Sequence, residues 1–134
     1  MIDLQAELQI DYSKWIGVPF EWAGEYDCWT LAKAVLAEHG IELPDYDYEP
    51  DNIDSIGRSI MAASAKPVWS EVAIPEPLDM VLLGSKDFLH HLGVYVGDDR
   101  LLHTTPRTGA LVQRLSRIKA LGPYRQWRAY RWVG

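Results

Sequence analysis

One cysteine and two histidines are the residues of this chain best suited to perform chemistry. Cys28 is the only cysteine in 134 residues and follows directly after Asp27. A thiol needs a base to take its proton, and the base needs a third group to fix its tautomer. His91 and His103 could supply these two roles. The alternative is a buried structural cysteine, because a free cysteine also packs as a small hydrophobe.

Cys28 is predicted to begin a helix over residues 28–39. Asp27 is a good N-cap and Gly40 is a good stop signal. We expect Cys28 at the first helical position, on the face that packs into the core. The helix dipole and nearby backbone N–H groups would there lower its pKa and favour the thiolate. Residues at helical spacing form this face: Cys28, Leu31, Ala32, Val35, Leu36 and His39.

The two histidines are placed by a predicted hairpin with strands at 92–96 and 101–105. Side chains of paired strands share a face only when the register has the right parity. An odd loop, or a bulge that restores parity, would put His91 and His103 on one face. We expect the three-residue loop 97–99, a common hairpin length. The N-terminus of the Cys28 helix should then pack against that same face.

A zinc site is an alternative, in which Cys28, His91 and His103 would bind the metal together with His90. Adjacent His90 and His91 are expected to point to opposite faces of a strand, and neither a CxxC nor an HExxH spacing occurs. We therefore expect no metal, and we interpret His39 and His90 as non-catalytic.

The order of the remaining elements predicts an α+β fold in a single domain, residues 1–134. Helical patterns come first and antiparallel strand patterns second, without a repeat or a linker. We expect further helices at 3–16 and 52–64, a loop at 41–50, and an extended segment between Pro67 and Pro77. The other expected elements are strands at 79–83, 111–115 and 124–133, with a short helical turn at 116–120.

Charge is unevenly distributed along the chain. The net charge is −6, yet residues 100–134 hold eight bases and no acid. Such asymmetry can mark a nucleic-acid surface. These bases alternate with strand-like aromatic residues instead of clustering, so we expect them to face the acidic part of the same domain and no nucleic acid. No run of 18 apolar residues predicts a membrane span, and the N-terminus shows no secretion signal.

Three motifs give the chain a resemblance to the NlpC-type cysteine peptidases, papain-like endopeptidases that cut bacterial cell-wall peptides. The first is the aromatic loop 19–24 followed by Asp27-Cys28 and a helix. The second is the Pro-bounded segment 75–83. The third and most specific is His-x-Gly-x-Tyr-x-Gly over 91–97, followed by a strand that ends in His103. The resemblance covers residues 12–133.

The resemblance implies a papain-like NlpC-type domain, with N-terminal helices packed on an antiparallel sheet. It implies hydrolysis of an amide bond in the peptidoglycan stem peptide, the γ-D-glutamyl–diaminopimelate bond, without a cofactor. Cys28 would be the nucleophile, His91 the base and His103 its orienting group. The aromatic residues near Cys28 would bind the substrate, although Phe20 stands where the family often has tyrosine. These residues are Phe20, Trp22, Tyr26 and Trp29.

The segment 27–29, with Gly40 to Pro44 after the helix, is most similar to the phage tail-associated branch. This similarity implies synthesis in the bacterial cytoplasm, association with phage tail proteins and action on the cell wall. Two alternatives stay open. One is an inactive tail or assembly component with the same fold, since fold does not fix function. The other is a related thiol amidase or acyltransferase.

Overall fold

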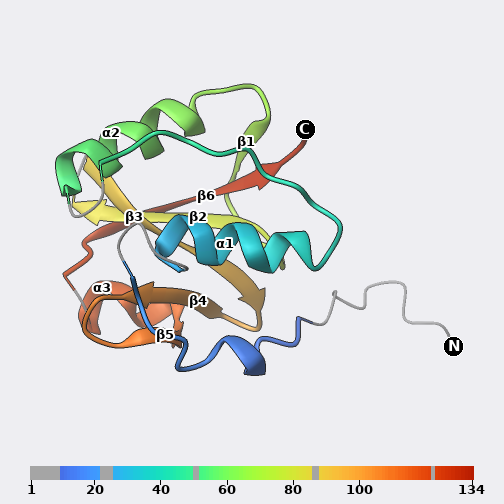
Figure 1. Ribbon diagram of the computed structural model, residues 1–134, viewed down its shortest axis with the longest axis vertical. Helices are drawn as coiled ribbons and strands as arrows, with labels where there is room; N and C mark the ends of the chain where they lie inside the picture. The colour runs from blue at the N-terminus through green and yellow to red at the C-terminus, as the bar shows by residue number, and fades with distance from the viewer. Residues whose placement is uncertain (1–9, 22–25, 50–51, 86–87, 122) are drawn as a thin grey trace, which may run out of the picture.

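The computed structural model describes residues 10–21, 26–49, 52–85, 88–121 and 123–134. Its centre is a six-stranded antiparallel sheet with the strand order β1-β6-β2-β3-β4-β5. Helices cover both faces of this sheet (Figure 1). The α+β class is therefore confirmed. The strands are β1 (Trp69–Val72), β2 (Met80–Ser85), β3 (Phe88–Gly97), β4 (Arg100–Thr105), β5 (Gly109–Arg114) and β6 (Gln126–Trp132).

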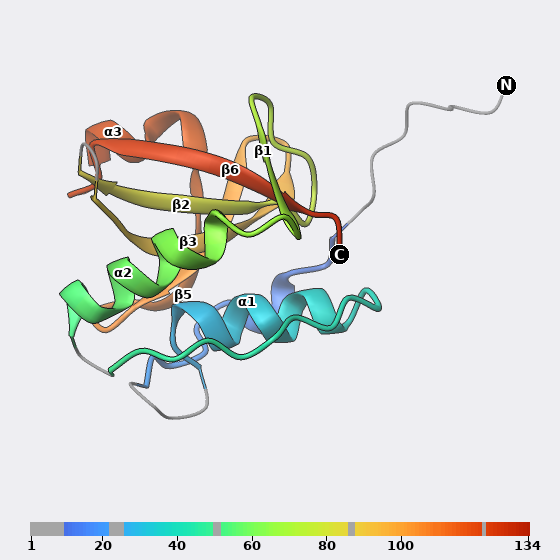
Figure 2. The same cartoon turned by 90° about the horizontal axis from the view of Figure 1, so that it is seen from above.

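The two longer helices lie on one side of the sheet and the short C-terminal helix on the other (Figure 2). The first pair is α1 (Cys28–Ala37) and α2 (Ile53–Ser64). The short pair is η2 (Leu115–Arg117) and α3 (Ile118–Leu121). Within the described part of the chain, no helix is long and apolar enough to cross a membrane.

Both faces of the sheet are buried, which gives the domain two apolar clusters. The first cluster joins α1 and α2 to Leu82, Leu92, Val94 and Leu102. The second joins η2 and α3 to side chains of the opposite sheet face: Val81, Leu83, Leu101 and Ala129. Burying one such large side chain contributes about 1.5–3 kcal/mol at most. The sheet is therefore held from both sides, and it fixes the residues that it carries.

Local signals in the sequence explain the start and end of α1. The Asp27 side chain accepts hydrogen bonds from the backbone N–H groups of Trp29 and Thr30, each at 3.0 Å. Thr30 completes a capping box by accepting from the Asp27 N–H at 2.7 Å. The helix ends before Gly40, which has the positive φ of +81° that suits glycine. The predicted helix is confirmed, although it ends two residues before residue 39 and His39 is exposed.

Most of the other predicted elements are confirmed as well, including α2 and the helical turn after β5. The predicted helix over residues 3–16 is the exception. Residues 3–9 lie outside the described residues. From residue 10 to 16 the chain forms only the 3-10 turn η1 (Ser13–Trp15). Ile10, Tyr12 and Trp15 of this segment pack against the first cluster without forming a longer helix.

The hairpin between β3 and β4 brings the two histidines onto one face by a route that differs from the expected one. The loop has two residues, Asp98 and Asp99, with φ of +51° and +62°, as a type I′ turn requires. The expected three-residue loop is therefore wrong. The register shifts once, between Tyr95 and Gly97, and beyond that bulge Val94 pairs with Leu102. This bulge restores the parity that the two histidines need.

Candidate active site

A chain of hydrogen bonds links three strands at the candidate site. His91 Nε2 lies 2.9 Å from His103 Nδ1, and His103 Nε2 lies 2.6 Å from Gln113 Oε1. Because the amide oxygen of Gln113 can only accept, His103 Nε2 carries a proton. In a neutral His103, Nδ1 is then an acceptor, so His91 donates from Nε2. This assignment leaves Nδ1 of a neutral His91 free to accept a proton.

The ring of Tyr124 lies flat against His91. Their ring centroids are 5.1 Å apart and their planes differ by only 4°. Stacking of this kind fixes the plane of the imidazole and removes water from one of its faces. Together with the bond to His103, it leaves His91, whose exposed fraction is 8%, one well-defined orientation. Neither Tyr124 nor Gln113 was predicted as a site residue, since nothing in the local sequence pattern distinguishes them.

The thiol of Cys28 meets strand β3 next to His91. Cys28 and Leu92, the residue after His91, lie in the same buried cluster and line the same pocket, and the backbone N–H of Leu92 acts to lower the pKa of the thiol. The backbone groups of Tyr95 bond to those of Leu78 and Asp79, on the side of β3 that faces β2. The backbone groups of successive residues in a strand point to opposite sides, so the N–H of Leu92 points toward β4. The register between β3 and β4 runs only as far as the pair Val94–Leu102. The N–H of Leu92 therefore lies beyond the last paired residues of these two strands.

The helix and the histidines nevertheless belong to opposite faces of the sheet. His91 pairs with Leu83, and Leu83 lies in the cluster under α3. Leu92, the neighbour of His91, lies in the cluster under α1. Our expectation that α1 packs against the histidine face is therefore wrong. Cys28 is the first residue of α1 and lies in the same buried cluster as Leu92, on the face opposite the histidines.

Burial governs the ionisation of both Cys28 and His91. Burial, and secondly the charge of Asp27, raise the pKa of the Cys28 thiol to about 12. The backbone N–H groups of Leu92 and of the helix N-terminus oppose this rise but do not overcome it. Burial, and secondly the neighbouring His103, hold the pKa of His91 well below its usual range. The predicted resting thiolate is therefore wrong, and both groups are neutral at pH 7.

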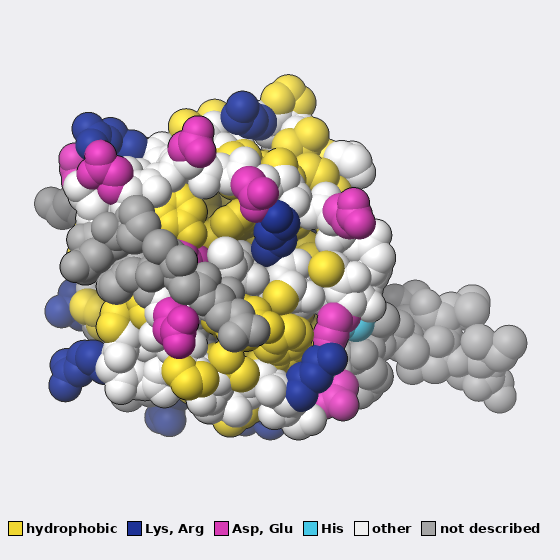
Figure 3. Space-filling model, in the orientation of Figure 1, with side chains coloured by type: hydrophobic (Ala, Val, Ile, Leu, Met, Phe, Trp, Pro, Cys, Tyr) yellow, Lys and Arg dark blue, Asp and Glu magenta, His cyan; other side chains and the backbone are white. Residues whose placement is uncertain are grey.

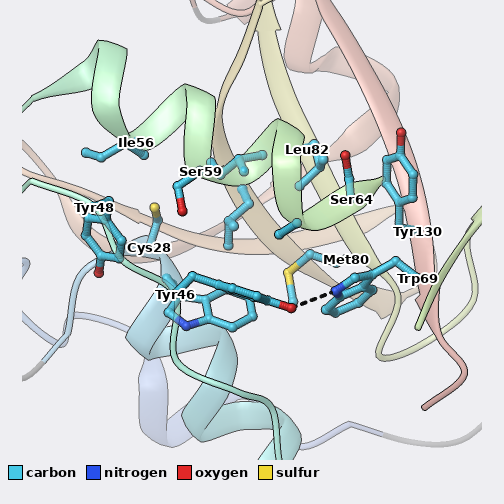
Figure 4. Close-up of a pocket in the computed structure, with 14 residues that line it drawn as sticks. Cys28, Tyr46, Tyr48, Ile56, Ser59, Ser64, Trp69, Met80, Leu82 and Tyr130 are labelled. Atoms are coloured by element: carbon cyan, nitrogen blue, oxygen red, sulfur yellow. Dashed lines mark hydrogen bonds between the residues drawn. The ribbon is translucent and has the colours of Figure 1, made fainter. Parts of the chain in front are cut away.

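An apolar pocket opens beside Cys28, between α1, α2 and the sheet (Figure 4). The segment 41–49, which connects α1 to α2, forms one wall through Tyr46 and Tyr48. The Tyr48 hydroxyl donates to Asp27, and the Tyr46 hydroxyl accepts from Trp69 Nε1 at 3.2 Å. The sequence predicted this segment correctly as a loop, but it did not indicate that the loop would line a site.

The four aromatic residues predicted to bind substrate are not all found at this pocket. Trp29 lines it, with its ring 5.0 Å from that of Tyr46. Tyr26 lies outside the lining and packs edge-on against Trp15, at 5.6 Å between ring centroids. Phe20 is half-buried and also outside the lining. Trp22 lies outside the described residues.

His90 lies nearer to the site than its place in the strand predicts. Leu83 pairs with His91 while Gly84 pairs with Leu89, so His90 is the extra residue of a bulge. Its ring centroid is 6.0 Å from that of Tyr124, the same ring that stacks on His91. The expected opposite orientation of the two neighbouring histidines is therefore wrong. No group of three metal-ligating side chains occurs among the residues that the structure describes.

Comparison with known proteins places this site in a family. Residues 17–126 match the NlpC/P60 family. The chain belongs to the NlpC/P60 family. The Escherichia coli K12 protein named murein DD-endopeptidase MepS/murein LD-carboxypeptidase is 22% identical over 120 residues. That alignment covers 86% of this chain but only 57% of the relative.

Solved structures of this family share the fold at low sequence identity. An NlpC/P60 family protein from Bacillus cereus has a TM-score of 0.59 at 19% identity, covering 91% of this chain and 38% of that one. The NlpC/p60 domain of the peptidoglycan hydrolase SagA has a TM-score of 0.53 at 17% identity, covering 87% and 89%. NlpC2 from Trichomonas vaginalis has a TM-score of 0.60 at 16% identity, covering 90% and 44%. The papain-like NlpC fold expected from the sequence is thereby confirmed.

Proposed function

We propose that this NlpC/P60 domain hydrolyses an amide bond in the peptidoglycan stem peptide, with Cys28 as the nucleophile. The observation that carries the proposal is the hydrogen-bonded chain from His91 through His103 to Gln113, which leaves Nδ1 of His91 free. Cys28 lies in the same buried cluster as Leu92, directly after His91 in the chain, and is near enough to Tyr124, which stacks on His91, to contribute to the raised pKa of Tyr124. The names of the relatives, a murein endopeptidase and a peptidoglycan hydrolase, support the substrate class.

In this mechanism the thiol and the imidazole begin as neutral groups. His91 Nδ1 takes the thiol proton while the sulfur bonds to the carbonyl carbon of the substrate. The resulting imidazolium donates from Nε2 to His103, which keeps the ring in place. His91 then gives the proton to the leaving nitrogen as the C–N bond breaks, and a thioester remains on Cys28. Water hydrolyses the thioester with His91 again as the base.

The N-terminus of α1 offers a donor for the oxyanion that forms during the attack. Asp27 binds the N–H groups of Trp29 and Thr30, and the N–H of Cys28 is not one of these two. We propose that the Cys28 N–H donates to the oxyanion, in a position where the helix dipole also favours negative charge. Donors of this kind contribute about 3–4 kcal/mol to the transition state in other proteases.

The proposed scissile bond is the γ-D-glutamyl–diaminopimelate link, and the proposed setting is a phage tail that acts on the cell wall. Purified protein incubated with defined muropeptides tests the activity, because mass spectrometry identifies the new termini. We expect cleavage by the unmodified chain and none by Cys28→Ala. The assay must include D,D- and L,D-linked substrates, since the name of the Escherichia coli relative refers to these bonds. Absence of cleavage at every bond would overturn the proposed activity.

One observation favours a second candidate, an inactive tail or assembly component with the same fold. Cys28 is only 7% exposed, and its pKa is raised to about 12. A protein of this kind would bind stem peptides without cleaving them. Calorimetric titration of unmodified protein with intact muropeptide separates the two functions. Binding without release of product would support the inactive component.

A further inference from the structure

In the proposed mechanism a positive charge forms on His91, inside the protein. His91 is 8% exposed, and histidine contributes only a small patch to the molecular face shown in Figure 3. Within the described part of the chain, no carboxylate bonds to His91. The charges that act on it are those of His103 and His90, and both lower its pKa. Because a buried cation without a counter-ion is costly, other groups must stabilise the imidazolium.

Two uncharged groups contact the ring of His91. His103 Nδ1 lies 2.9 Å from His91 Nε2, within hydrogen-bond distance. The ring of Tyr124 lies parallel to the imidazole, within 4°, at 5.1 Å between ring centroids. The face of an aromatic ring carries partial negative charge and attracts a cation within about 6 Å of its centroid. Tyr124 therefore presents a weakly negative surface to the group on which the charge forms.

The aromatic ring of Tyr124, and not a charge on its hydroxyl, makes this contact. Burial, and secondly Cys28, raise the pKa of Tyr124 to about 12, so the hydroxyl is uncharged at pH 7. No lysine or arginine among the described residues lies over this ring. The ring of His90 is 6.0 Å away between centroids, and burial lowers the pKa of His90, so it is neutral as well. The ring of Tyr124 is thus not engaged by another cation at pH 7.

We propose that Tyr124 is a positioning residue that stabilises the imidazolium of His91 through its aromatic face while Cys28 attacks the substrate. The proposal rests on the proposed function, in which His91 takes the thiol proton. Tyr124 then fills the electrostatic role that a carboxylate has in a Ser-His-Asp triad. A neutral ring adds no repulsion against an anionic stem peptide, whereas a further carboxylate beside Cys28 would repel it.

Fluorination of the ring at position 124 tests this role, because it weakens the negative face and changes the shape of the ring little. Tyr124 is replaced by phenylalanine and, through nonsense suppression, by 4-fluoro-, 3,5-difluoro- and 3,4,5-trifluorophenylalanine. NMR of the histidine rings in a Cys28→Ala background gives the pKa of His91 without any hydrolysis. We expect this pKa to fall with each fluorine, by about one pH unit over the series. Equal pKa values across the series would overturn the inference.

A kinetic measurement at pH 7 keeps the test valid if acid unfolds the protein before His91 is protonated. Cys28 is acylated with 4-nitrophenyl acetate: the sulfur bonds to the acetyl carbon, 4-nitrophenolate leaves, and His91 takes the thiol proton. The imidazolium forms in this reaction too. We expect the trifluorinated variant to react about tenfold more slowly than Tyr124→Phe. A rate that does not depend on the number of fluorines would refute the role of the ring.

A second tyrosine provides a matched control for removal of the ring. Tyr95 lies on the same strand and the same sheet face as His91, and no ring contact joins the two among the described residues. Tyr124→Leu should lower kcat/KM for a muropeptide by about 30-fold. Tyr124→Phe and Tyr95→Leu should each stay within about threefold of the unmodified protein. Equal losses in Tyr124→Leu and Tyr95→Leu would contradict the proposal.

The outcomes for Tyr124 and for the proposed function are distinguishable. A pKa of His91 that falls with fluorination, together with no cleavage of any muropeptide, overturns the proposed hydrolysis and supports the role of the ring. Cleavage at equal rates by every member of the fluorinated series, with equal pKa values, overturns the inference and leaves the proposed hydrolysis in place.

Discussion

Replacing Asp27 with asparagine should lower the pKa of Cys28 and speed its alkylation. The carboxylate of Asp27 is 2% exposed, and its charge is the second cause, after burial, of the raised thiol pKa. Asparagine keeps an oxygen that can accept from the N–H groups of Trp29 and Thr30, so the helix cap is retained. The substitution thus removes a charge and keeps the two cap bonds, while the Tyr48 hydroxyl, which donates to the other Asp27 oxygen, must accept from the new amide.

The size of the effect follows from the thiolate fraction. With a pKa of about 12, roughly one Cys28 in 10⁴ is thiolate at pH 8, against about a quarter of free cysteine with its pKa near 8.5. The unmodified protein should therefore react with iodoacetamide about 10³-fold more slowly than free cysteine at this pH. Each pKa unit that Asp27→Asn removes raises the rate about tenfold.

The assay is the rate of iodoacetamide alkylation between pH 6 and 11, followed by intact mass. In the unmodified protein we expect the rate to rise about tenfold per pH unit without levelling below pH 10. Asp54→Asn is the control, because the Asp54 side chain is 70% exposed and lies on α2. A rate that levels off below pH 8.5 would refute the claim that Cys28 and His91 are both neutral at rest. So would an unchanged profile in an Asp27→Asn variant that keeps its helical circular dichroism.

Four other substitutions test the packing of the fold and the geometry of the site. Gly93→Ala should lower the free energy of unfolding in urea by about 1–3 kcal/mol, because the added Cβ would meet a backbone oxygen at 2.8 Å and the Cβ of His103 at 2.9 Å. Arg131→Ala should cost about 1–3 kcal/mol, since the 2% exposed Asp79 loses hydrogen bonds of 2.9 and 2.8 Å. Arg58→Ala, in an exposed pair, should change the same free energy by less than about 0.5 kcal/mol. His103→Ala should reduce kcat and shift its pH profile without abolishing turnover, and an unchanged profile would remove its positioning role.

Local signals were sufficient to predict most of the fold. The Asp27 cap and the Gly40 stop are short-range features, so α1 could be placed within two residues of its observed end. The alternation of residues 92–96 predicted β3. Successive side chains of a strand point to opposite faces even where both faces are buried, as in β3. Parity then predicted that His91 and His103 share a face, although a bulge and not a longer loop achieves it.

The arrangement of the site depended on long-range packing that the sequence does not encode locally. A parity rule assigns side chains to faces, but it does not show that Cys28 joins the cluster of Leu92, on the face opposite the histidines. The bulge that carries His90 toward Tyr124 has no distinctive residue in β3 itself. The raised pKa of Cys28 likewise results mainly from burial by distant segments, which outweighs the helix N-terminus that the sequence does reveal.

Turnover of a muropeptide by His91→Ala, compared with His90→Ala, tests the central claim most directly. Both histidines lie beside Tyr124, but only His91 bonds to His103. If His91 takes the proton of Cys28, His91→Ala should show no detectable kcat/KM, while His90→Ala should retain most of the activity of the unmodified protein. Near-normal turnover by a folded His91→Ala variant would contradict the assignment of His91 as the base.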